Sequence, residues 1–352
     1  MLKVLGIESS CDETAVAIVS EDCNILSHNL YSQIKEHEVH GGVIPELAAR
    51  NHLHHINNLI LKSLQDASLT LNDIDAFSAT AGPGLVGGLI TGTIYAKTMS
   101  LIYSKPFIAV NHLQGHALVA KLENLPLKFP YLLLLISGGH TQFIAVLDVL
   151  KYEILGETID DALGECFDKV ARVLGFSYPG GAKIEEVAKI GNELKYTFPK
   201  PLQYSNNCNF SFSGLKTSVN NFFNSALKNI TNKEIKQELI ADIAASFQYT
   251  IAKLFDVKTK KAIDMFIKKY NQLPTAFIPS GGVASNLYLQ SKLKSIVNKL
   301  NIDFMVPSKS LCTDNGVMIA YSALLMLKQG IQHDLSFKIN PRWSLNDLST
   351  TI

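Results

Sequence analysis

The feature that most constrains the fold is a pattern of three short apolar segments that occurs twice. Helical patterns follow each set, and strands that alternate with helices in this way predict an α/β protein. The repetition predicts an internal duplication, and therefore two similar lobes. The six segments lie at residues 3–7, 15–19, 25–31, 131–136, 142–147 and 152–158.

A polar turn follows the first segment of each set. The first turn, Ser9–Thr14, carries hydroxyls and acids, and the second contains Gly138 and Gly139 beside Ser137. Glycines with small hydroxyl neighbours after a strand suit backbone N–H groups that point at an anion such as phosphate. Two lobes with facing phosphate turns would define a nucleotide cleft.

Two histidines, His112 and His116, lie four residues apart in a segment with a helical pattern. On one helix face their Cβ atoms would be about 5–6 Å apart, which one transition-metal ion can bridge. The alternative is a pair of half-buried histidines bonded to backbone carbonyls. The zinc-peptidase helix needs a glutamate directly after the first histidine. Leu113 occupies that position, so a peptidase is disfavoured.

Three further segments leave alternatives open. The glycine-rich turn after residue 80 lacks the Lys-Ser/Thr pair of a phosphate-binding Walker loop, so close packing and nucleotide binding are equally compatible with it. Ser280–Asn286 joins a strand to a helix with glycines that would let the backbone approach a purine or ribose, and the helix start favours anions. Asp314 precedes the last helical pattern, either as its N-terminal cap or as an oxygen ligand opposite the two histidines.

Other polar segments are interpreted as structural. His52, His54 and His55 are expected to be solvated or to cap a helix, and the lysines between residues 242 and 270 to form a solvated helix face. Residues 178–216 are expected to be loop-rich. Phe210 and Phe212 in that segment would either cover a base or fill a lobe.

The composition favours a soluble cytoplasmic protein of two domains. The chain has 352 residues, of which 47% are hydrophobic, a net charge of +1, and no apolar run long enough to span a membrane. Five cysteines without C-x-x-C spacing indicate reduced thiols. We expect an N-terminal lobe at residues 1–106 with 317–330 packing back on it, a second lobe at 107–316 that carries the metal and nucleotide sites, and a tail at 331–352.

Ten motifs, taken in order, resemble one family: the tRNA N6-adenosine threonylcarbamoyltransferases, in their bacterial or organellar form. Each motif alone is weak, but the ordered set, which runs from about residue 3 to 345, is specific. His140 marks the bacterial or organellar branch, and Leu135 stands where the archaeal branch has a metal-binding tyrosine. The motifs lie at residues 6–14, 41–46, 82–84, 111–116, 137–141, 161–168, 179–181, 211–216, 280–286 and 312–316.

The resemblance implies an α/β fold of the two-lobe actin, heat-shock chaperone and sugar-kinase type, with duplicated RNase H-like lobes. It implies an acyltransferase that moves the threonylcarbamoyl group from threonylcarbamoyl-AMP to the exocyclic amine of the adenosine 3′ to the anticodon, in tRNAs that read codons beginning with A. AMP is released. The implied partners are tRNA, a paralogous actin-like subunit and a small ATPase, with no membrane.

The resemblance also implies the site residues. His112, His116 and Asp314 would hold one divalent metal, for which Fe²⁺ is the family's metal and Zn²⁺ also suits the ligand types. Asp12 or Glu13 would be the general base for the amine proton. The residues implied to bind the donor are Leu135, Ile136, Ser137, Gly138, Gly139, His140, Asp168, Gly181, Glu185, Gly282 and Asn286.

Two alternatives besides the peptidase remain at this stage. A sugar-kinase-like phosphotransferase would share the fold but would release phosphate from ATP in the presence of a small acceptor. A non-catalytic, ATP-dependent scaffold would bind nucleotide without any dependence on metal.

Overall fold

The computed structural model describes residues 1–123, 127–228 and 232–348. Contacts within the chain define two compact units. Unit 1 comprises Met1–Leu127, Val146–Glu153 and Pro307–Ile352, and unit 2 comprises Lys128–Ala145 and Ile154–Val306. The last four residues of the expected tail, 349–352, lie outside the described residues.

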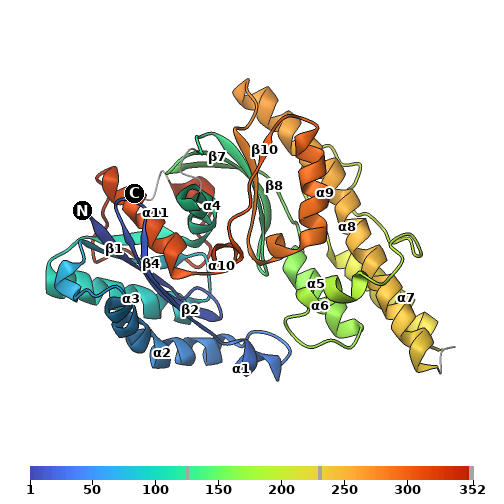
Figure 1. The fold of residues 1–352 in the computed structure, drawn as a ribbon, viewed down its shortest axis with the longest axis horizontal. Helices are drawn as coiled ribbons and strands as arrows, with labels where there is room; N and C mark the ends of the chain where they lie inside the picture. Colours follow the sequence, from blue (N-terminus) through green and yellow to red (C-terminus); the bar gives the residue numbers. More distant parts are fainter. Residues whose placement is uncertain (124–126, 229–231, 349–352) are drawn as a thin grey trace. The chain divides into compact units, whose positions relative to one another are not determined.

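Unit 1 contains a mixed five-stranded sheet in the order β3-β2-β1-β4-β5 (Figure 1). The first three strands pair antiparallel, whereas β4 and β5 continue the sheet in parallel with β1. The strands are β1 (Lys3–Glu8), β2 (Glu13–Ser20), β3 (Ile25–Ser32), β4 (Ala76–Gly82) and β5 (Phe107–Asn111).

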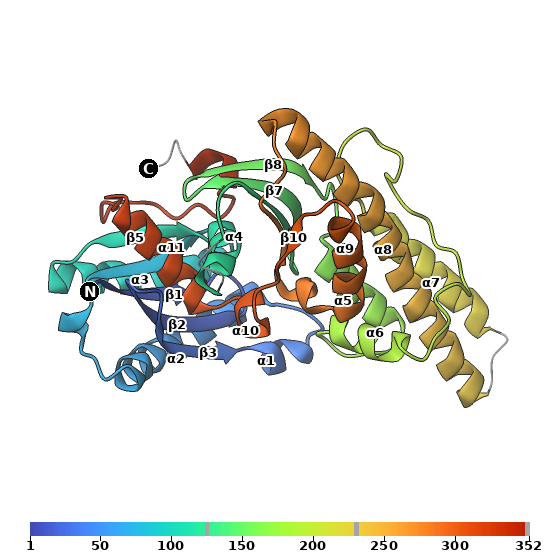
Figure 2. The same cartoon turned by 45° about the horizontal axis from the view of Figure 1, so that its top comes forward.

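Helices cover both faces of this sheet. α2 and α3 pack side by side on one face, and α11 lies on the other (Figures 1 and 2). Gly6 of β1 makes the approach of α11 possible, because a Cβ atom there would lie 2.3 Å from the backbone nitrogen of Ala320. The helices are α1 (Ile34–Glu38), α2 (Pro45–Asp66), η1 (Leu71–Asp73), α3 (Val86–Tyr103), α4 (His112–Glu123), α10 (Lys309–Cys312), α11 (Gly316–Lys328) and η3 (Leu345–Asp347).

Unit 2 is built on a second five-stranded sheet, in the order β10-β9-β6-β7-β8. β6 lies at its centre, pairs in parallel with β9, and is buried at all six positions. Buried central strands read as continuous apolar runs, which is why Tyr131–Ile136 was predicted with the observed bounds. The strands are β6 (Tyr131–Ile136), β7 (Thr141–Asp148), β8 (Lys151–Glu157), β9 (Ala276–Ser280) and β10 (Asp303–Phe304).

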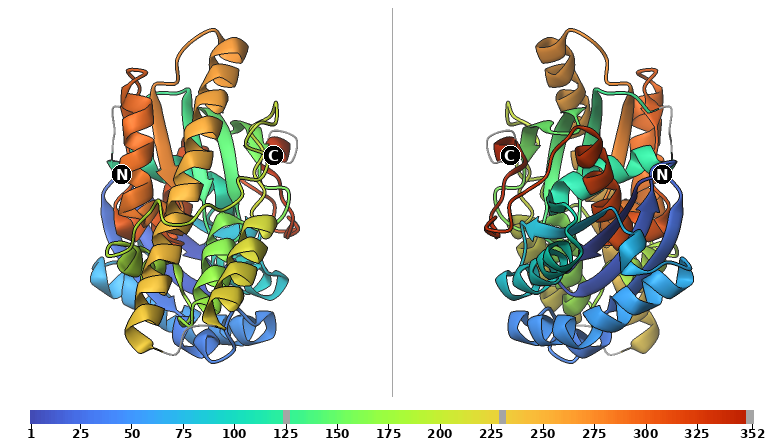
Figure 3. Two further views of the ribbon diagram at one scale, coloured as in Figure 1. Left: turned by 90° about the vertical axis from the view of Figure 1, so that its right-hand side faces the viewer. Right: turned by 90° about the vertical axis from the view of Figure 1, so that its left-hand side faces the viewer.

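The long helix α8 organises the helical part of unit 2. It packs against α6, α7 and α9, and the left view of Figure 3 shows α9 beside it. Asn232 caps its start by accepting hydrogen bonds from the N–H groups of Glu234 and Ile235. The helices are α5 (Leu163–Val173), α6 (Gly181–Ala188), α7 (Ser213–Leu227), α8 (Lys233–Tyr270), η2 (Gly282–Ser285) and α9 (Leu287–Asn298).

The segment expected to be loop-rich, 178–216, contains helix α6 and the start of α7. Phe210 and Phe212 in this segment are buried core residues. Their rings stack on each other, and Phe210 also stacks on Phe143. They therefore fill unit 2 and do not cover a base.

The two units differ from the expected lobes at α4 and at the segments that end unit 1. α4 belongs to unit 1 because it packs against α11, whereas the sequence placed residues 107–316 in the second lobe. The pairing of these helices is close: a Cβ atom on Gly115 would lie 2.9 Å from Met318 Cγ. The two histidines of α4 consequently lie in unit 1, and the expected donor-binding residues lie in unit 2.

Candidate functional site

Helix α4 holds His112 and His116 on one face. Asn111, the last residue of β5, accepts hydrogen bonds from the N–H groups of Leu113 and Gln114, and its own amide donates to Trp343 O at 3.0 Å. The helix start is thus tied to the C-terminal segment of unit 1. The two imidazole rings are 4.8 Å apart at an interplanar angle of 87°, and both side chains are buried.

Asp314 meets both histidines from the turn between α10 and α11. Its Oδ1 lies 3.0 Å from His116 Nε2 and 3.6 Å from His112 Nε2. The helix cap that Asp314 was alternatively expected to supply is formed by Asn315, whose Oδ1 accepts from Met318 N at 2.8 Å. Asp314 is therefore placed to contact a ligand together with the two histidines.

Glu8 is a fourth residue of this cluster, and the sequence analysis gave it no role. It ends β1 fully buried, and His112 Nδ1 lies 3.1 Å from its Oε2. Thr80 Oγ1 donates to the same oxygen, and Ser10 N donates to Oε1 at 2.6 Å. Because a carboxylate only accepts, Nδ1 of His112 carries the proton and Nε2 faces Asp314.

The electrostatics of the cluster favour positive charge. Burial alone would lower the pKa of His112, but Asp314 and Glu8 outweigh it and raise the pKa to about 9. For Glu8, burial acts to raise the pKa, and His112 outweighs it, so the pKa of Glu8 is lowered. Asp314 thus places negative charge beside Nε2 of both imidazoles, and Glu8 places it beside Nδ1 of His112.

These residues fit a divalent metal. One ligand atom from each of His112, His116 and Asp314 lies within 4.8 Å of the others. Two imidazole nitrogens and one carboxylate oxygen are a donor set that suits iron or zinc. If His112 bound a metal through Nε2, Glu8 would supply the carboxylate that accepts from its other ring nitrogen and fixes its tautomer.

Asp12 lies on the turn between β1 and β2, and Glu13 is the first residue of β2. Asp12 is buried and Glu13 is half-buried. Burial, followed by the negative charges of Asp12 and Asp314, raises the pKa of Glu13 well above its usual value.

The glycine-rich turn after β4 is a packing element. A Cβ atom on Gly84 would lie 2.7 Å from Ser10 Cβ, and one on Gly88 would lie 2.0 Å from Ser9 O. The N-terminal part of α3 therefore lies directly against the Ser9–Thr14 turn. This favours the close-packing interpretation of the glycines over nucleotide binding.

In unit 2 the expected phosphate turn follows β6. Leu135 and Ile136 are fully buried strand residues, whereas Gly138 and Gly139 are exposed. A Cβ atom added to either glycine would have no neighbouring atom within 4 Å. The turn is closed by a hydrogen bond from Ser137 N to His140 O at 2.8 Å. His140 N in turn donates to Ser137 Oγ. An anion could approach the two glycines from solvent.

The turn after β9 lies against the turn that follows β6. Gly281 adopts φ +95°, and a Cβ atom there would lie 2.5 Å from Ile136 O. Gly282 follows directly, and Asn286 caps α9 by accepting from Leu289 N at 2.9 Å. The amide nitrogen of Asn286 donates to Gln248 Oε1 at 2.7 Å. Unit 2 thus brings Ser137, Gly282 and their neighbouring turns together.

Asp168, Gly181 and Glu185 lie on neighbouring helices of unit 2. Asp168 Oδ1 accepts from Gly180 N at 2.7 Å, which holds the start of α6 against α5. Glu185 Oε1 accepts from Leu287 N at 2.8 Å at the start of α9. A cavity of about 390 Å³ adjoins this contact and is lined by Glu185, Ala188, Lys189, Gly191, Glu193, Ala245, Gln248, Leu287 and Tyr288.

Comparison with known proteins assigns the family. A model of the tRNA N6-adenosine threonylcarbamoyltransferase family matches residues 24–321. Proteins of that description from Rickettsia conorii and Rickettsia bellii are 49% and 48% identical, and each alignment spans 99% of this chain and all of the relative. The chain belongs to this family. Family membership makes it a transferase that acts on tRNA, as the resemblance of the ten motifs implied.

Solved structures support the fold class. The chain is similar to full-length HypF in a phosphate- and nucleotide-bound form, with a TM-score of 0.60 at 13% identity over 93% of this chain and 56% of HypF. HypF of T. kodakarensis gives the same TM-score at 14% identity, over 93% and 48% of the two chains. These likenesses show the fold alone, which is the predicted actin, heat-shock chaperone and sugar-kinase type. In the part of the chain that the structure describes, no helix meets the length and hydrophobicity needed to cross a bilayer.

Proposed function

We propose that the protein transfers the threonylcarbamoyl group from threonylcarbamoyl-AMP to the N6 amine of the adenosine 3′ to the anticodon, and releases AMP. The acceptors would be tRNAs that read codons beginning with A. The observation that carries the proposal is the 49% identity, over 99% of the chain, to a relative described as a tRNA N6-adenosine threonylcarbamoyltransferase.

The proposed chemistry explains why an activated donor is needed. The lone pair of the N6 amine is delocalised into the purine ring, so the amine is a poor nucleophile. In the reaction a bond forms between N6 and the carbamoyl carbon, the bond from that carbon to a phosphate oxygen breaks, and AMP leaves with the electron pair. One amine proton must be taken up as this happens.

His112, His116 and Asp314 are the proposed metal ligands, with iron as the first candidate and zinc as the second. A divalent metal bound there would supply Lewis-acid chemistry towards an oxygen of the donor. Glu8 would hold His112 in the tautomer that presents Nε2, through the contact at 3.1 Å. The raised pKa of His112 supports the proposal, because the same oxygens that stabilise its proton would stabilise a cation.

Asp12 is the proposed general base. Burial and the negative charges of Asp12 and Asp314 raise the pKa of Glu13 well above its usual value, which favours its protonated form. Because a protonated carboxyl group cannot accept the amine proton, Asp12 is the first candidate for the base and Glu13 the second. General-base assistance of this kind is typically worth a factor of about 10² to 10⁴ in rate.

The donor-binding residues are proposed from unit 2. Ser137, Gly138 and Gly139 would bind the phosphate through the exposed turn, and Gly282 and Asn286 would bind the adenosine. Leu135, Ile136 and His140 would complete the strand end and the turn. Two acids and one glycine of the neighbouring helices would contact the threonylcarbamoyl part: Asp168, Glu185 and Gly181.

Partners are part of the proposal because acidic residues balance the basic ones, with 31 Asp and Glu against 32 Lys and Arg. Lys258 is fully buried and donates to Ser205 Oγ and Asn207 O, and Lys260 pairs with Asp256. The lysines of α8 therefore partly serve the fold, and the net charge of the chain is only +1. Affinity for a phosphate backbone depends on such charges. A paralogous actin-like subunit and a small ATPase are the proposed partners.

A cytoplasmic location is proposed for the same reaction. Its tRNA substrate is found in that compartment, and all five cysteines are unpaired, as expected of reduced thiols.

A metallopeptidase is disfavoured by the position of Glu8. This glutamate lies beside His112 in space, although not in the sequence motif. Both of its oxygens already accept hydrogen bonds from Ser10, Thr80 and His112, and the side chain is fully buried. A peptidase base must instead reach a water molecule beside the metal.

The test is direct detection of the product. Protein, its partners, tRNA transcript and threonylcarbamoyl-AMP labelled with ¹³C at the carbamoyl carbon are incubated, and the tRNA is digested to nucleosides for mass spectrometry. The expected result is labelled threonylcarbamoyladenosine and one AMP per nucleoside formed. A transcript with guanosine 3′ to the anticodon is the matched control. Release of AMP without labelled nucleoside, or phosphate release from ATP with a small acceptor, would contradict the proposal.

A further inference from the structure

A buried histidine on α2, His52, contacts the residues on either side of Asp12 and Glu13, where the β1–β2 turn leads into β2. His52 Nδ1 lies 2.8 Å from Thr14 Oγ1, and His52 Nε2 lies 3.1 Å from Cys11 O. The side chain is 0% exposed. The expectation that His52 would be solvated or would cap a helix was therefore wrong, because α2 turns this residue towards the sheet.

The hydrogen bonds fix the protonation of the ring. Cys11 O is a carbonyl and can only accept, so Nε2 of His52 carries the proton. Nδ1 then accepts from the hydroxyl of Thr14. Burial lowers the pKa of His52, which agrees with a neutral ring. The neutral imidazole thus bridges Cys11 and Thr14, with one nitrogen that donates and one that accepts.

The remaining backbone contacts of the turn come from other elements. Gln33 N donates to Asp12 O at 3.0 Å, and Leu85 N donates to Ser10 O at 2.7 Å. Helix α3 also supports the ring itself, since a Cβ atom on Gly88 would lie 2.9 Å from His52 Nε2. His52 is the side chain that spans from Cys11 to Thr14, the two residues that flank the acids.

We propose that His52 is a positioning residue for the transfer reaction, which holds Asp12 and Glu13 in place by bridging Cys11 O and Thr14 Oγ1. The inference rests on the proposed role of Asp12. His52 itself touches no substrate: it acts by keeping the turn closed. Its loss should therefore lower turnover and leave the Michaelis constant for the donor nearly unchanged.

Cys11 provides a readout of the turn that does not depend on activity. Burial, then the charge of Asp12, raises the pKa of its thiol well above the usual value. Alkylation requires the thiolate, so Cys11 should react slowly while the turn is closed. Cys23 is a partly exposed cysteine on the β2–β3 turn, and it serves as an internal control when each site is quantified by mass spectrometry.

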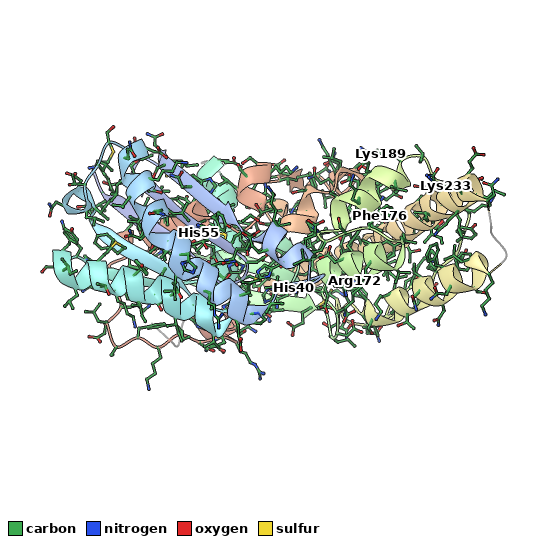
Figure 4. The ribbon with its side chains drawn as sticks, turned by 90° about the horizontal axis from the view of Figure 1, so that it is seen from below. His40, His55, Arg172, Phe176, Lys189 and Lys233 are labelled. Carbon is green, nitrogen blue, oxygen red and sulfur yellow. The ribbon has the colours of Figure 1, made fainter. Side chains whose placement is uncertain are left out.

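Three variants remove one or both hydrogen bonds of this bridge. Thr14→Val removes one bond, His52→Gln retains a donor for Cys11 O but loses the contact with Thr14, and His52→Ala removes both. We expect Cys11 alkylation to rise by about fivefold for each bond lost, while Cys23 does not change. His55→Gln is the matched control, because this histidine of the same helix stacks on Tyr31 (His55 is labelled in Figure 4).

Alkylation and turnover are measured on the same preparations, with thermal unfolding as the check on folding. The inference is supported if Cys11 alkylation rises and kcat falls with each bond lost, while the donor KM stays constant. His52→Gln should then retain more activity than His52→Ala. Unchanged alkylation in folded His52→Ala or in Thr14→Val overturns it, and so does faster alkylation at parental kcat. If the parent protein with its partners makes no threonylcarbamoyladenosine, the proposed function fails, while the alkylation rates still decide whether His52 closes the turn.

Discussion

Replacing Glu8 by glutamine should weaken metal binding without unfolding unit 1. All three neighbours of the Glu8 carboxylate are positioned to donate: Ser10 N at one oxygen, and Thr80 Oγ1 and His112 Nδ1 at the other. An amide places an NH₂ group at one of these positions. If that group faces His112, the ring must accept at Nδ1 and move its proton to Nε2, which is the nitrogen that faces Asp314.

The size of the effect follows from this change of tautomer. Loss of the carboxylate that orients a metal-binding histidine typically weakens metal affinity by about 10- to 100-fold, which is about 1.4 to 2.8 kcal/mol. The buried position of Glu8 favours the upper half of that range. If the NH₂ group instead faces Ser10 N, two donors meet in a buried place, and stability falls by about 1–3 kcal/mol.

Cobalt(II) titration followed by its visible absorption measures the affinity, and thermal unfolding of the metal-free protein measures the second effect. Asp75→Asn is the matched control, because Asp75 accepts from Lys3 N at 2.8 Å in the same unit and is not part of the metal cluster. We expect Glu8→Gln to bind cobalt at least tenfold more weakly than Asp75→Asn. Affinity within twofold of the parent would refute the assignment of Glu8 as the group that orients His112.

Three further predictions concern the base, the acid stability and the partners. Asp12→Asn should reduce turnover by about 10²-fold or more with donor affinity retained, and Glu13→Gln should reduce it less; donor binding and rate that fall together would show that both acids only shape the turn. His333 accepts from Ala109 N at 3.1 Å and has its pKa lowered by burial to about 4, so the unfolded state binds a proton between pH 6.5 and 4 and the folded state does not. The free energy of unfolding should therefore fall across this window by about 2 kcal/mol after allowance for partial exposure. His333→Asn keeps an acceptor but does not titrate, so its free energy of unfolding, measured with urea, should fall by about 2 kcal/mol less than that of the parent between pH 7.5 and pH 4.5. The protein alone should turn over poorly at physiological salt, and full multiple-turnover activity without partners would contradict the assignment of tRNA binding to the complex.

The strands of the two repeated sets were predictable because each is a local apolar run, and the six expected segments agree with β1 to β3 and β6 to β8 within two residues at every end. The helical pair His112 and His116 was predictable for the same reason, since it depends only on the spacing along α4. α6 was not predicted, because Pro179 and two glycines at its start indicate a turn and the helix is only eight residues long. Local pattern thus describes the elements better than the segments that join them.

Contacts between distant segments could not be predicted from pattern. Glu8 meets His112 across 104 positions, and His52 meets Thr14 across 38. An acid that ends a buried strand and a histidine within a helical pattern both have common structural explanations, so neither indicates its partner. The placement of α4 in unit 1 has the same origin, because it depends on the packing of α4 against α11, which follows almost 200 residues later.

The central claim is that transfer requires a metal held by His112, His116 and Asp314. Its most direct test is to remove metal from the protein, restore Fe²⁺ stepwise under anaerobic conditions with partners, donor and tRNA present, and measure threonylcarbamoyladenosine against bound metal. The account predicts that the rate rises in proportion to occupancy up to one ion per chain, and that folded His112→Ala and His116→Ala neither bind the ion nor form the product. Parental rates in the metal-free protein, or in either variant, would contradict it.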